Sequence, residues 1–232
     1  MFFDWTYVVY VLPAVIFAMW ASAHVNSTYN KYKNQLSARG ITGAQAARMV
    51  LDANGLYHVR IEQVAGELSD HFDPRTNVVR LSQGVYDNTS TAAIGIACHE
   101  VGHAIQHATG YVPVKIRTAI VPITNLGSKL SMPLILIGLV LGAFSEWMFM
   151  LVYAGIACFA LSTVFQLVTL PTEFNASRRA MDSIQTYNIL SDDELRGTRK
   201  VLTAAAMTYV AALAVSVMQL LRLLLLAGRR RR

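Results

Sequence analysis

The run His99-Glu100-Val101-Gly102-His103 places two imidazoles and a carboxylate where they can share a metal ion. On a helix, residues four apart lie on one face about one turn apart, so His99 and His103 can bind the same zinc ion. Glu100 can take a proton from a water molecule that the metal activates and then deliver it to the leaving amine. The spacing predicts a zinc metalloendopeptidase with one zinc ion per chain, His99 and His103 as metal ligands, and Glu100 as general base.

A catalytic zinc ion needs a third protein ligand and keeps one position open for water. His107 lies two turns beyond His99, about 12 Å along the helix axis, so one ion cannot reach both. Glu146 lies at the tip of a predicted membrane hairpin, on the membrane face opposite the histidines. Glu173 lies where that hairpin returns to the starting face. The topology therefore favours Glu173 as the third ligand, followed by Asp182.

The histidines need a helix to hold them, and residues 91–107 predict one, with Gly110 just past its end. A polar block of residues 24–117 surrounds this helix. Within it, residues 42–54 predict a short amphipathic helix with Thr42 as its N-cap. Short alternating runs at residues 59–64 and 78–81 predict two or three strands.

The rest of the chain is apolar, which indicates a membrane protein. Only 15% of the residues are charged, against about 25% in a soluble domain. Uncharged runs at residues 5–23, 130–144 and 147–168 predict an N-terminal anchor and a transmembrane hairpin that turns at residues 145–146. No basic residue precedes the first run, so an uncleaved anchor is favoured over a signal peptide. Pro171 is expected to end the second arm, with a new helix after it.

These segments predict a mainly α-helical, multi-pass membrane protein with a small β-sheet beside the helix that carries the histidines. The expected divisions are a membrane anchor at 1–25, a catalytic region at 26–117, a transmembrane hairpin at 118–170, a helix with the third zinc ligand at 171–200, and a membrane segment with a basic tail at 201–232.

Four runs together carry a resemblance to a known family. They are LSDHFDPR at 68–75, VRLS at 79–82, ACHEVGHAIQ at 97–106 and LPTEFNAS at 170–177. They resemble the YugP-like neutral zinc metallopeptidases of bacterial membranes, over nearly the whole chain. The resemblance implies a gluzincin-like zinc peptidase core in a bacterial inner (plasma) membrane.

The order of the motifs is also similar to that of the HtpX/Ste24-type membrane proteases. In those proteins the later motif reads ExxAD, and its Glu completes the zinc site. Here Glu173 and Ala176 match that pattern, but Ser177 stands where the Asp would be. The resemblance thus supports Glu173 as a ligand. Three residues remain candidates for orienting the histidines, namely Asn175, Ser177 and Asp182.

The predicted function is hydrolysis of polypeptide substrates, such as membrane proteins or peptides, near the bilayer surface. In proteases of this type a sheet edge commonly holds the substrate, and the strand at Asn77 to Leu81 is the candidate, unless it only covers the helix. One alternative is a non-catalytic zinc-binding scaffold, which would need no base at Glu100. Another is a site-two-type intramembrane protease, for which residues 91–107 are too polar.

The formal net charge of +6 lies beside apolar segments and in the tail Arg229 to Arg232. This distribution indicates contact with a lipid bilayer and argues against nucleic acid. Basic residues flank the polar regions and not the hairpin tip, so the catalytic region is expected in the cytoplasm. The tail conflicts with this, so either residues 201–226 are not a simple span or the orientation is reversed. Cys98 and Cys158 are expected to be free, and the sequence gives no oligomeric state.

Overall fold

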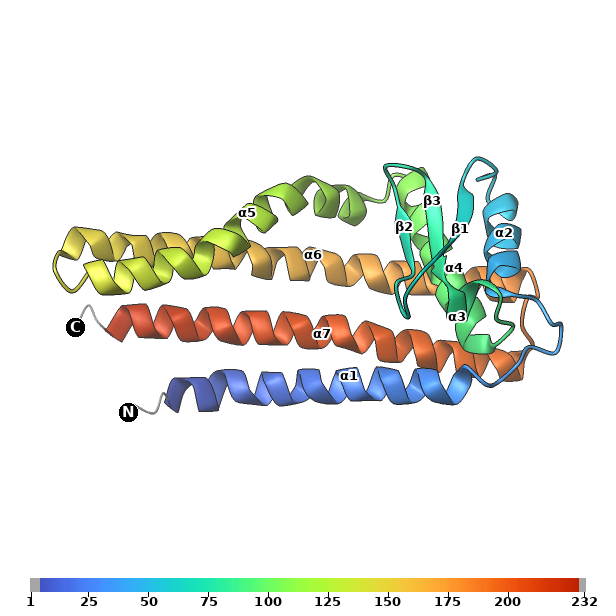
Figure 1. The fold of residues 1–232 in the computed structure, drawn as a ribbon, viewed down its shortest axis with the longest axis horizontal. Coiled ribbons are helices and arrows are strands. Elements are labelled where there is room, and N and C mark those ends of the chain that lie inside the picture. Colours follow the sequence, from blue (N-terminus) through green and yellow to red (C-terminus); the bar gives the residue numbers. More distant parts are fainter. Residues whose placement is uncertain (1–4, 230–232) are drawn as a thin grey trace. The chain divides into compact units, whose positions relative to one another are not determined.

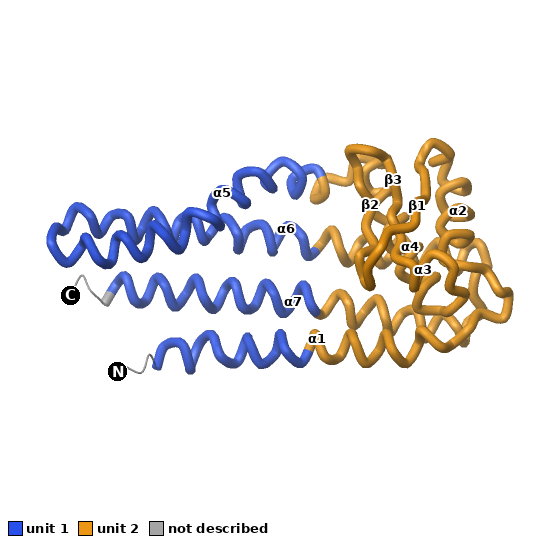
Figure 2. Tube along the Cα trace, in the orientation of Figure 1, with its two compact units in different colours: residues 1–20, 115–170, 208–232 blue, residues 21–114, 171–207 orange. Residues whose placement is uncertain are grey.

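The computed structural model describes residues 5–229, which divide into two compact units (Figure 2). The first unit comprises residues 1–20, 115–170 and 208–232, and the second comprises residues 21–114 and 171–207. Four helices run from one unit into the other: α1 (Leu12–Tyr32), α5 (Val112–Leu141), α6 (Met150–Thr186) and α7 (Asp192–Arg229).

The first unit is built from helices alone among its described residues. It contains η1 (Tyr7–Val11), most of α5 (Val112–Leu141), η2 (Glu146–Phe149) and parts of α1, α6 and α7. Four helical stretches are long and apolar enough to cross a membrane: Tyr7–Tyr32, Val112–Leu141, Glu146–Thr186 and Asp192–Gly228. The predicted multi-pass, mainly helical architecture is therefore confirmed at this level.

Small residues bring α5 and α6 close together inside the first unit. A Cβ atom on Gly138 would lie 2.6 Å from the backbone nitrogen of Val152, and one on Gly155 would lie 2.7 Å from the carbonyl oxygen of Ser131. The Ser131 hydroxyl donates a hydrogen bond to the Gly155 carbonyl at 3.0 Å. Glycine contacts and hydroxyl bonds of this kind hold helices together in lipid, where burial of apolar side chains gives no advantage.

Pro171 does not end the second arm of the hairpin, so that prediction is wrong. α6 continues through Pro171 to Thr186, and α5 likewise continues through Pro122 and Pro133. A proline removes one backbone hydrogen bond, but packing of the residues on both sides can maintain the helix. Figure 1 shows that α5 bends along its length, as proline-containing helices do.

Residues 201–226 lie within one unbroken helix, α7, which favours a simple span over an interrupted segment. The Arg222 guanidinium lies 5.4 Å from the ring centroid of Tyr7 in η1. Arg222 also donates a hydrogen bond to Gln219, one turn earlier in the helix, at 3.5 Å. These contacts give the charge in the apolar segment nearby partners. The end of the basic tail, residues 230–232, lies outside the described residues.

The second unit contains the predicted sheet. Its strands are β1 (Arg60–Val64), β2 (His71–Asp73) and β3 (Val78–Ser82), in the order β1–β3–β2. β3 runs parallel to β1 and antiparallel to β2. Because β3 has a neighbour on each side, the expectation that Asn77 to Leu81 forms a substrate-binding edge is wrong. The edges of this sheet belong to β1 and β2.

Two helices of the second unit begin where the sequence predicts. α2 (Gly43–Ala53) starts after Thr42, whose side chain accepts from the backbone nitrogen of Gln45 while the Gln45 side chain accepts from that of Thr42. α4 (Thr91–Ala108) starts after Ser90, whose hydroxyl accepts from the Ala93 nitrogen, and Gly110 follows its end at a φ of 65°. Such caps satisfy backbone groups that the first helical turn leaves without partners.

α4 forms the centre of the second unit. The apolar face of α2 packs against it, and the short helix α3 (Gln83–Tyr86) lies between β3 and α4 in the chain. α7 reaches α4 at Gly95, where an added Cβ would lie 2.6 Å from a methyl carbon of Thr198. The Thr198 hydroxyl donates to the Thr91 carbonyl at 2.9 Å. The helix that carries the histidines is thus fixed from several sides.

Candidate metal centre

Three potential metal ligands from α4 and α6 meet in the second unit. They are His99 and His103 of α4 and Glu173 of α6, and one potential ligand atom of each lies within 4.8 Å of the others. The side chains of the two histidines are only 15% and 12% exposed, and that of Glu173 is 3% exposed. These three residues are the ones for which the sequence predicts metal binding, and they lie together.

A glycine in the motif allows α6 to come this close. A Cβ atom on Gly102 would lie 2.5 Å from the carbonyl oxygen of Ala176 and 3.1 Å from its Cα atom. Only a residue without a side chain therefore permits this packing of α4 on α6. Ala176 lies three residues after Glu173, so both are on the same face of α6. The contact at Gly102 thus brings the Glu173 carboxylate beside the histidines.

The distances from the Glu173 carboxylate to the two histidines fit a shared zinc ion. Oε2 of Glu173 lies 3.3 Å from Nε2 of His99 and 3.5 Å from Nε2 of His103. A tetrahedral zinc ion with bonds of about 2.0–2.1 Å separates its ligand atoms by about 3.3–3.4 Å. Two imidazole nitrogens and one carboxylate oxygen are also a common ligand set of catalytic zinc sites.

A chain of hydrogen bonds fixes the orientation of His103. Arg179, which can only donate, bonds through Nε to Oδ1 of Asn175 at 2.8 Å. The Gln106 amide nitrogen donates to that same Oδ1 at 3.0 Å and to the Thr172 carbonyl at 2.7 Å. The Gln106 oxygen must therefore be the atom that faces Nδ1 of His103, at 3.0 Å. Because an amide oxygen only accepts, Nδ1 of His103 carries the proton.

This assignment leaves the lone pair on Nε2 of a neutral His103 pointing toward the Glu173 carboxylate. Such an arrangement is repulsive unless a cation or a proton lies between the two atoms. Burial alone would lower the pKa of His103, but the neighbouring carboxylates of Glu173 and Glu100 outweigh burial and raise it. The surroundings of His103 therefore favour a positive charge at this position.

His99 has a different partner. Its Nδ1 lies 3.1 Å from the hydroxyl oxygen of Ser177, which is one turn beyond Glu173 on α6. With Nε2 directed at the shared centre, Nδ1 of His99 donates this bond and the hydroxyl accepts it. Of the candidates for orienting the histidines, Ser177 thus contacts His99, and Asn175 reaches His103 through Gln106. Asp182 is exposed on α6 and is not among the residues gathered at the site.

Glu100 is buried, at 8% exposure, on the same helix as the two histidines. Its negative charge acts on His103 and helps to raise the pKa of that residue. Glu100 is not one of the three residues that converge on the candidate metal position. A carboxylate beside a metal site but outside its ligands is the arrangement expected of a general base.

The other acidic and histidine residues considered from the sequence have separate places. The ring of His107 packs on Phe72 of β2, with centroids 5.5 Å apart. Glu146 begins η2 in the first unit. Asp70 accepts hydrogen bonds from the backbone and hydroxyl of Ser82. The sheet and the turn beside it therefore account for His107 and Asp70, and Glu146 lies in the other unit.

Sequence reasoning did not identify Gln106 or Arg179. A signal for Gln106 was present, because it lies three residues after His103 and so on the same face of α4. Arg179 similarly lies four residues after Asn175 on α6. The sequence alone does not show that these two pairs join, since the link between Gln106 and Asn175 depends on how α4 and α6 pack.

Comparisons with known proteins agree with this chemistry. The model of a family described as "Putative neutral zinc metallopeptidase" matches residues 7–228. The chain is 44% identical over 215 residues to a protein of Bacillus subtilis (strain 168) named "Putative membrane protease YugP", covering 93% of each chain. No solved structure matches it. The extent of both matches shows that the chain belongs to this family of neutral zinc metallopeptidases.

Proposed function

We propose that this protein is a membrane-embedded, zinc-dependent endopeptidase of the gluzincin type. His99, His103 and Glu173 are the proposed ligands of one zinc ion per chain, and Glu100 is the proposed general base. The observation that carries this proposal is the position of the Glu173 carboxylate, whose Oε2 atom lies 3.3 and 3.5 Å from the Nε2 atoms of His99 and His103. The presence of Glu100 beside them favours a catalytic site over a purely structural one.

A zinc ion bound in this way would supply a Lewis acid and lower the pKa of a water molecule toward about 7. The residues of the chain then have distinct roles. Gln106 and Ser177 hold the two imidazoles in the tautomer that directs Nε2 at the metal position. The Glu100 carboxylate accepts a proton from the attacking water and returns it to the nitrogen of the leaving amine.

An extended polypeptide is the proposed substrate, and the sheet offers a place for it. β2 is an edge strand, and its residue Phe72 packs on His107, one turn beyond His103 in α4. A peptide that pairs with the outer edge of β2 would gain backbone hydrogen bonds without a specific sequence. This edge takes over the role first assigned to Asn77 to Leu81, and it suits membrane proteins or peptides near the bilayer surface.

The proposed location is a bacterial inner membrane, with the catalytic region in the cytoplasm. Basic residues on the polar segments outnumber the four arginines of the tail: Lys31, Lys33, Arg39, Lys115, Arg117, Arg178, Arg179, Arg196, Arg199 and Lys200. Positive charge near the ends of membrane helices favours the cytoplasmic side, and this larger group outweighs the tail, which a simple span of α7 would then place outside. The proposed divisions of the chain remain the anchor at 1–25, the catalytic region at 26–117, the hairpin at 118–170, the ligand-bearing helix at 171–200 and the terminal segment at 201–232.

The test is cleavage of an unfolded protein by the full chain in detergent, with zinc content measured alongside. Glu100→Gln should bind zinc as the wild type does but cleave about 100- to 10,000-fold more slowly, because it lacks a base. Glu146→Gln is the matched control and should cleave normally.

Normal cleavage by Glu100→Gln would remove the assignment of the general base. A wild-type protein that binds zinc through four protein ligands and cleaves neither soluble nor membrane-bound substrates would favour the non-catalytic scaffold. Cleavage confined to peptide bonds inside a bilayer would favour the site-two-type protease.

A further inference from the structure

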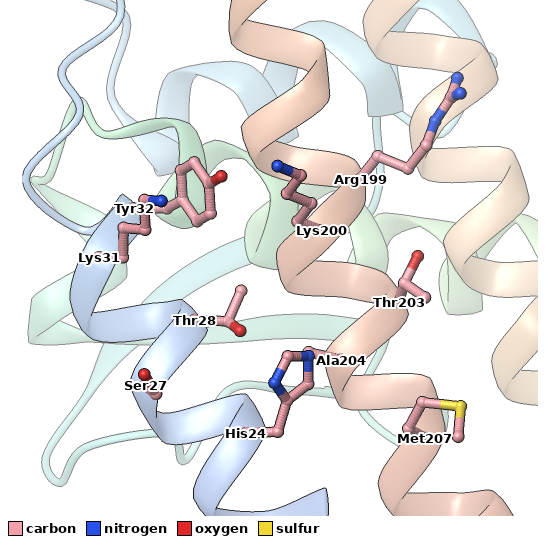
Figure 3. Close-up of a pocket in the computed structure, with 10 residues that line it drawn as sticks. All are labelled: His24, Ser27, Thr28, Lys31, Tyr32, Arg199, Lys200, Thr203, Ala204 and Met207. Atoms are coloured by element: carbon pink, nitrogen blue, oxygen red, sulfur yellow. The ribbon is translucent and has the colours of Figure 1, made fainter.

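A second candidate site lies between two helices of the second unit. An open cavity of about 610 Å³ lies between α1 and α7, lined by residues from 24–32 of α1 and 199–207 of α7 (Figure 3). Three of its lining residues are basic, namely Lys31, Arg199 and Lys200. None of the described residues that line it is acidic. The cavity therefore has a positive charge that its own walls do not balance.

The cavity also offers polar groups suited to an anion. Thr28 and Tyr32 of α1 and Thr203 of α7 contribute hydroxyls. In Figure 3, Lys200 extends from α7 toward α1, and the hydroxyl of Tyr32 points back toward Lys200. An ammonium group and hydroxyls arranged in this way suit the oxygen atoms of a phosphate group.

Close packing fixes the wall that carries Tyr32. A Cβ atom on Gly197 of α7 would lie 2.8 Å from Cδ1 and 3.0 Å from Cε1 of the Tyr32 ring. Glycine at this position therefore lets the ring lie directly on α7, one turn before Lys200. The amine of Lys31 lies 5.6 Å from the centroid of the same ring. The basic and hydroxyl groups are thus arranged around an aromatic ring that the helices hold in place.

The cavity lies where both helices pass from apolar to charged sequence. The apolar run of the first segment ends just before His24, and that of α7 begins just after Lys200. Both helices are long and apolar enough to cross a membrane. Residues at such a transition lie at the level of lipid headgroups. Basic pockets between membrane helices at this level are suited to anionic headgroups.

We propose that this cavity binds the headgroup of an anionic phospholipid. Lys200 and Lys31 would contact the phosphate, and Arg199 would add positive charge at the rim. Ala204 and Met207 line the cavity further along α7, toward the apolar part of the helix, and would contact the acyl chains. A lipid is favoured over a soluble phosphate because the cavity adjoins two apolar helical segments. The site does not depend on peptidase activity.

The test is a lipid titration of the full chain in a neutral detergent, followed by native mass spectrometry. The probe is short-chain phosphatidylglycerol, with phosphatidylcholine of the same chain length and inorganic phosphate as comparisons. We expect saturable binding of phosphatidylglycerol that millimolar inorganic phosphate does not displace. The double variant Lys31→Gln/Lys200→Gln should bind it roughly 30-fold more weakly, from the loss of two charges near an anionic lipid.

The matched control is Arg60→Gln/Arg75→Gln, which removes the same charge from exposed residues outside the cavity. It should bind phosphatidylglycerol as the wild type does. Equal binding by the wild type and the Lys31/Lys200 variant, or equal weakening in both double variants, would overturn the proposed site. Equal affinity for phosphatidylcholine would overturn its preference for anionic lipid. Displacement by inorganic phosphate would identify a soluble anion site and overturn the lipid assignment.

Discussion

Gly102 is the residue at which a single methyl group should separate the helices that carry the proposed zinc ligands. In Gly102→Ala, the added Cβ would lie 2.5 Å from the carbonyl oxygen of Ala176, whereas ordinary contact begins at 3.4 Å. The neighbouring atom belongs to the backbone, so no side chain can rotate away. The two helices must therefore separate by about 0.9 Å, the difference between these distances.

A shift of this size is large for a metal site. Oε2 of Glu173 is now 3.3 Å from Nε2 of His99, and ligand distances in metal sites hold to within about 0.2 Å. Moving α6 away from α4 would carry Glu173 out of range of an ion that both histidines still hold. We expect the zinc dissociation constant to rise about 10- to 100-fold, as when a group that supports a metal ligand is lost.

Gly95→Ala is the matched control, because it adds the same methyl group to the same helix. Its Cβ would lie 2.6 Å from a methyl carbon of Thr198 on α7, which carries none of the proposed ligands. Each variant should lose roughly 1–3 kcal/mol to overpacking, partly offset by the higher helix propensity of alanine. Only Gly102→Ala should also lose zinc affinity.

The assay is competition for zinc against a chelator in detergent, with the thermal midpoint of the metal-free protein measured in parallel. The reasoning fails if Gly102→Ala is folded and binds zinc within about twofold of wild type. It fails equally if both variants lose zinc affinity to the same extent, since that would reflect general destabilisation.

Ser177→Ala should weaken zinc binding about tenfold, because Nδ1 of His99 loses its acceptor, while Ser177→Asp should keep or tighten it. Equal zinc affinities of the wild type and Ser177→Ala in the same chelator assay would remove this role. Gln106→Leu should weaken zinc binding by about 10- to 100-fold through loss of the bond to His103, and an unchanged dissociation constant would refute the chain of hydrogen bonds. Removal of zinc by a chelator should lower the thermal midpoint of the wild type, since the ion would bind ligands on both α4 and α6. A midpoint that does not depend on free zinc would contradict this. If the catalytic region faces the cytoplasm, a cysteine introduced at the exposed residue Tyr57, in a Cys158→Ser background, should react with an impermeant maleimide in inverted membrane vesicles and not in intact cells. The opposite pattern of labelling would reverse the proposed orientation.

The elements with local signals were predicted well from the sequence. Thr42 and Ser90 begin α2 and α4, because a capping side chain competes only with groups in its own turn. Gly55 and Gly110 follow these helices with positive φ angles of 73° and 65°. The apolar runs likewise predict the membrane segments, since a candidate span is recognised from the length and composition of the run alone.

The sequence did not predict features that depend on how segments pack. A proline usually ends a helix, but α6 continues past Pro171 because the following turns pack on α4 at Gly102. The order of strands is equally non-local. One signal of burial was present, since Val78, Val79 and Leu81 are apolar on both faces, as in a strand that is covered on both faces of its sheet.

The proposed metal ligands are intermediate between features with a local sequence signal and features that depend on packing. Two come from a local motif, but Glu173 was favoured by the topology of a hairpin, without any knowledge of contacts. That argument correctly predicted that the Glu173 side chain lies beside His99 and His103, even though Pro171 does not break the helix. The reason is that it depended only on which membrane face the chain returns to, and a continuous α6 returns to the same face as an interrupted one.

The charges at the centre explain how Ser177 can replace the aspartate of the related motif. Glu173 and Glu100 are both buried, and the groups that hold the histidines, Ser177 and Gln106, are both neutral. Two buried carboxylates beside two neutral imidazoles carry two negative charges, which a divalent cation balances. An aspartate at position 177 would add a third negative charge and make the occupied centre anionic. The hydroxyl instead accepts a hydrogen bond from Nδ1 of His99 and leaves the zinc-bound centre neutral, which avoids the cost of burying an unbalanced charge.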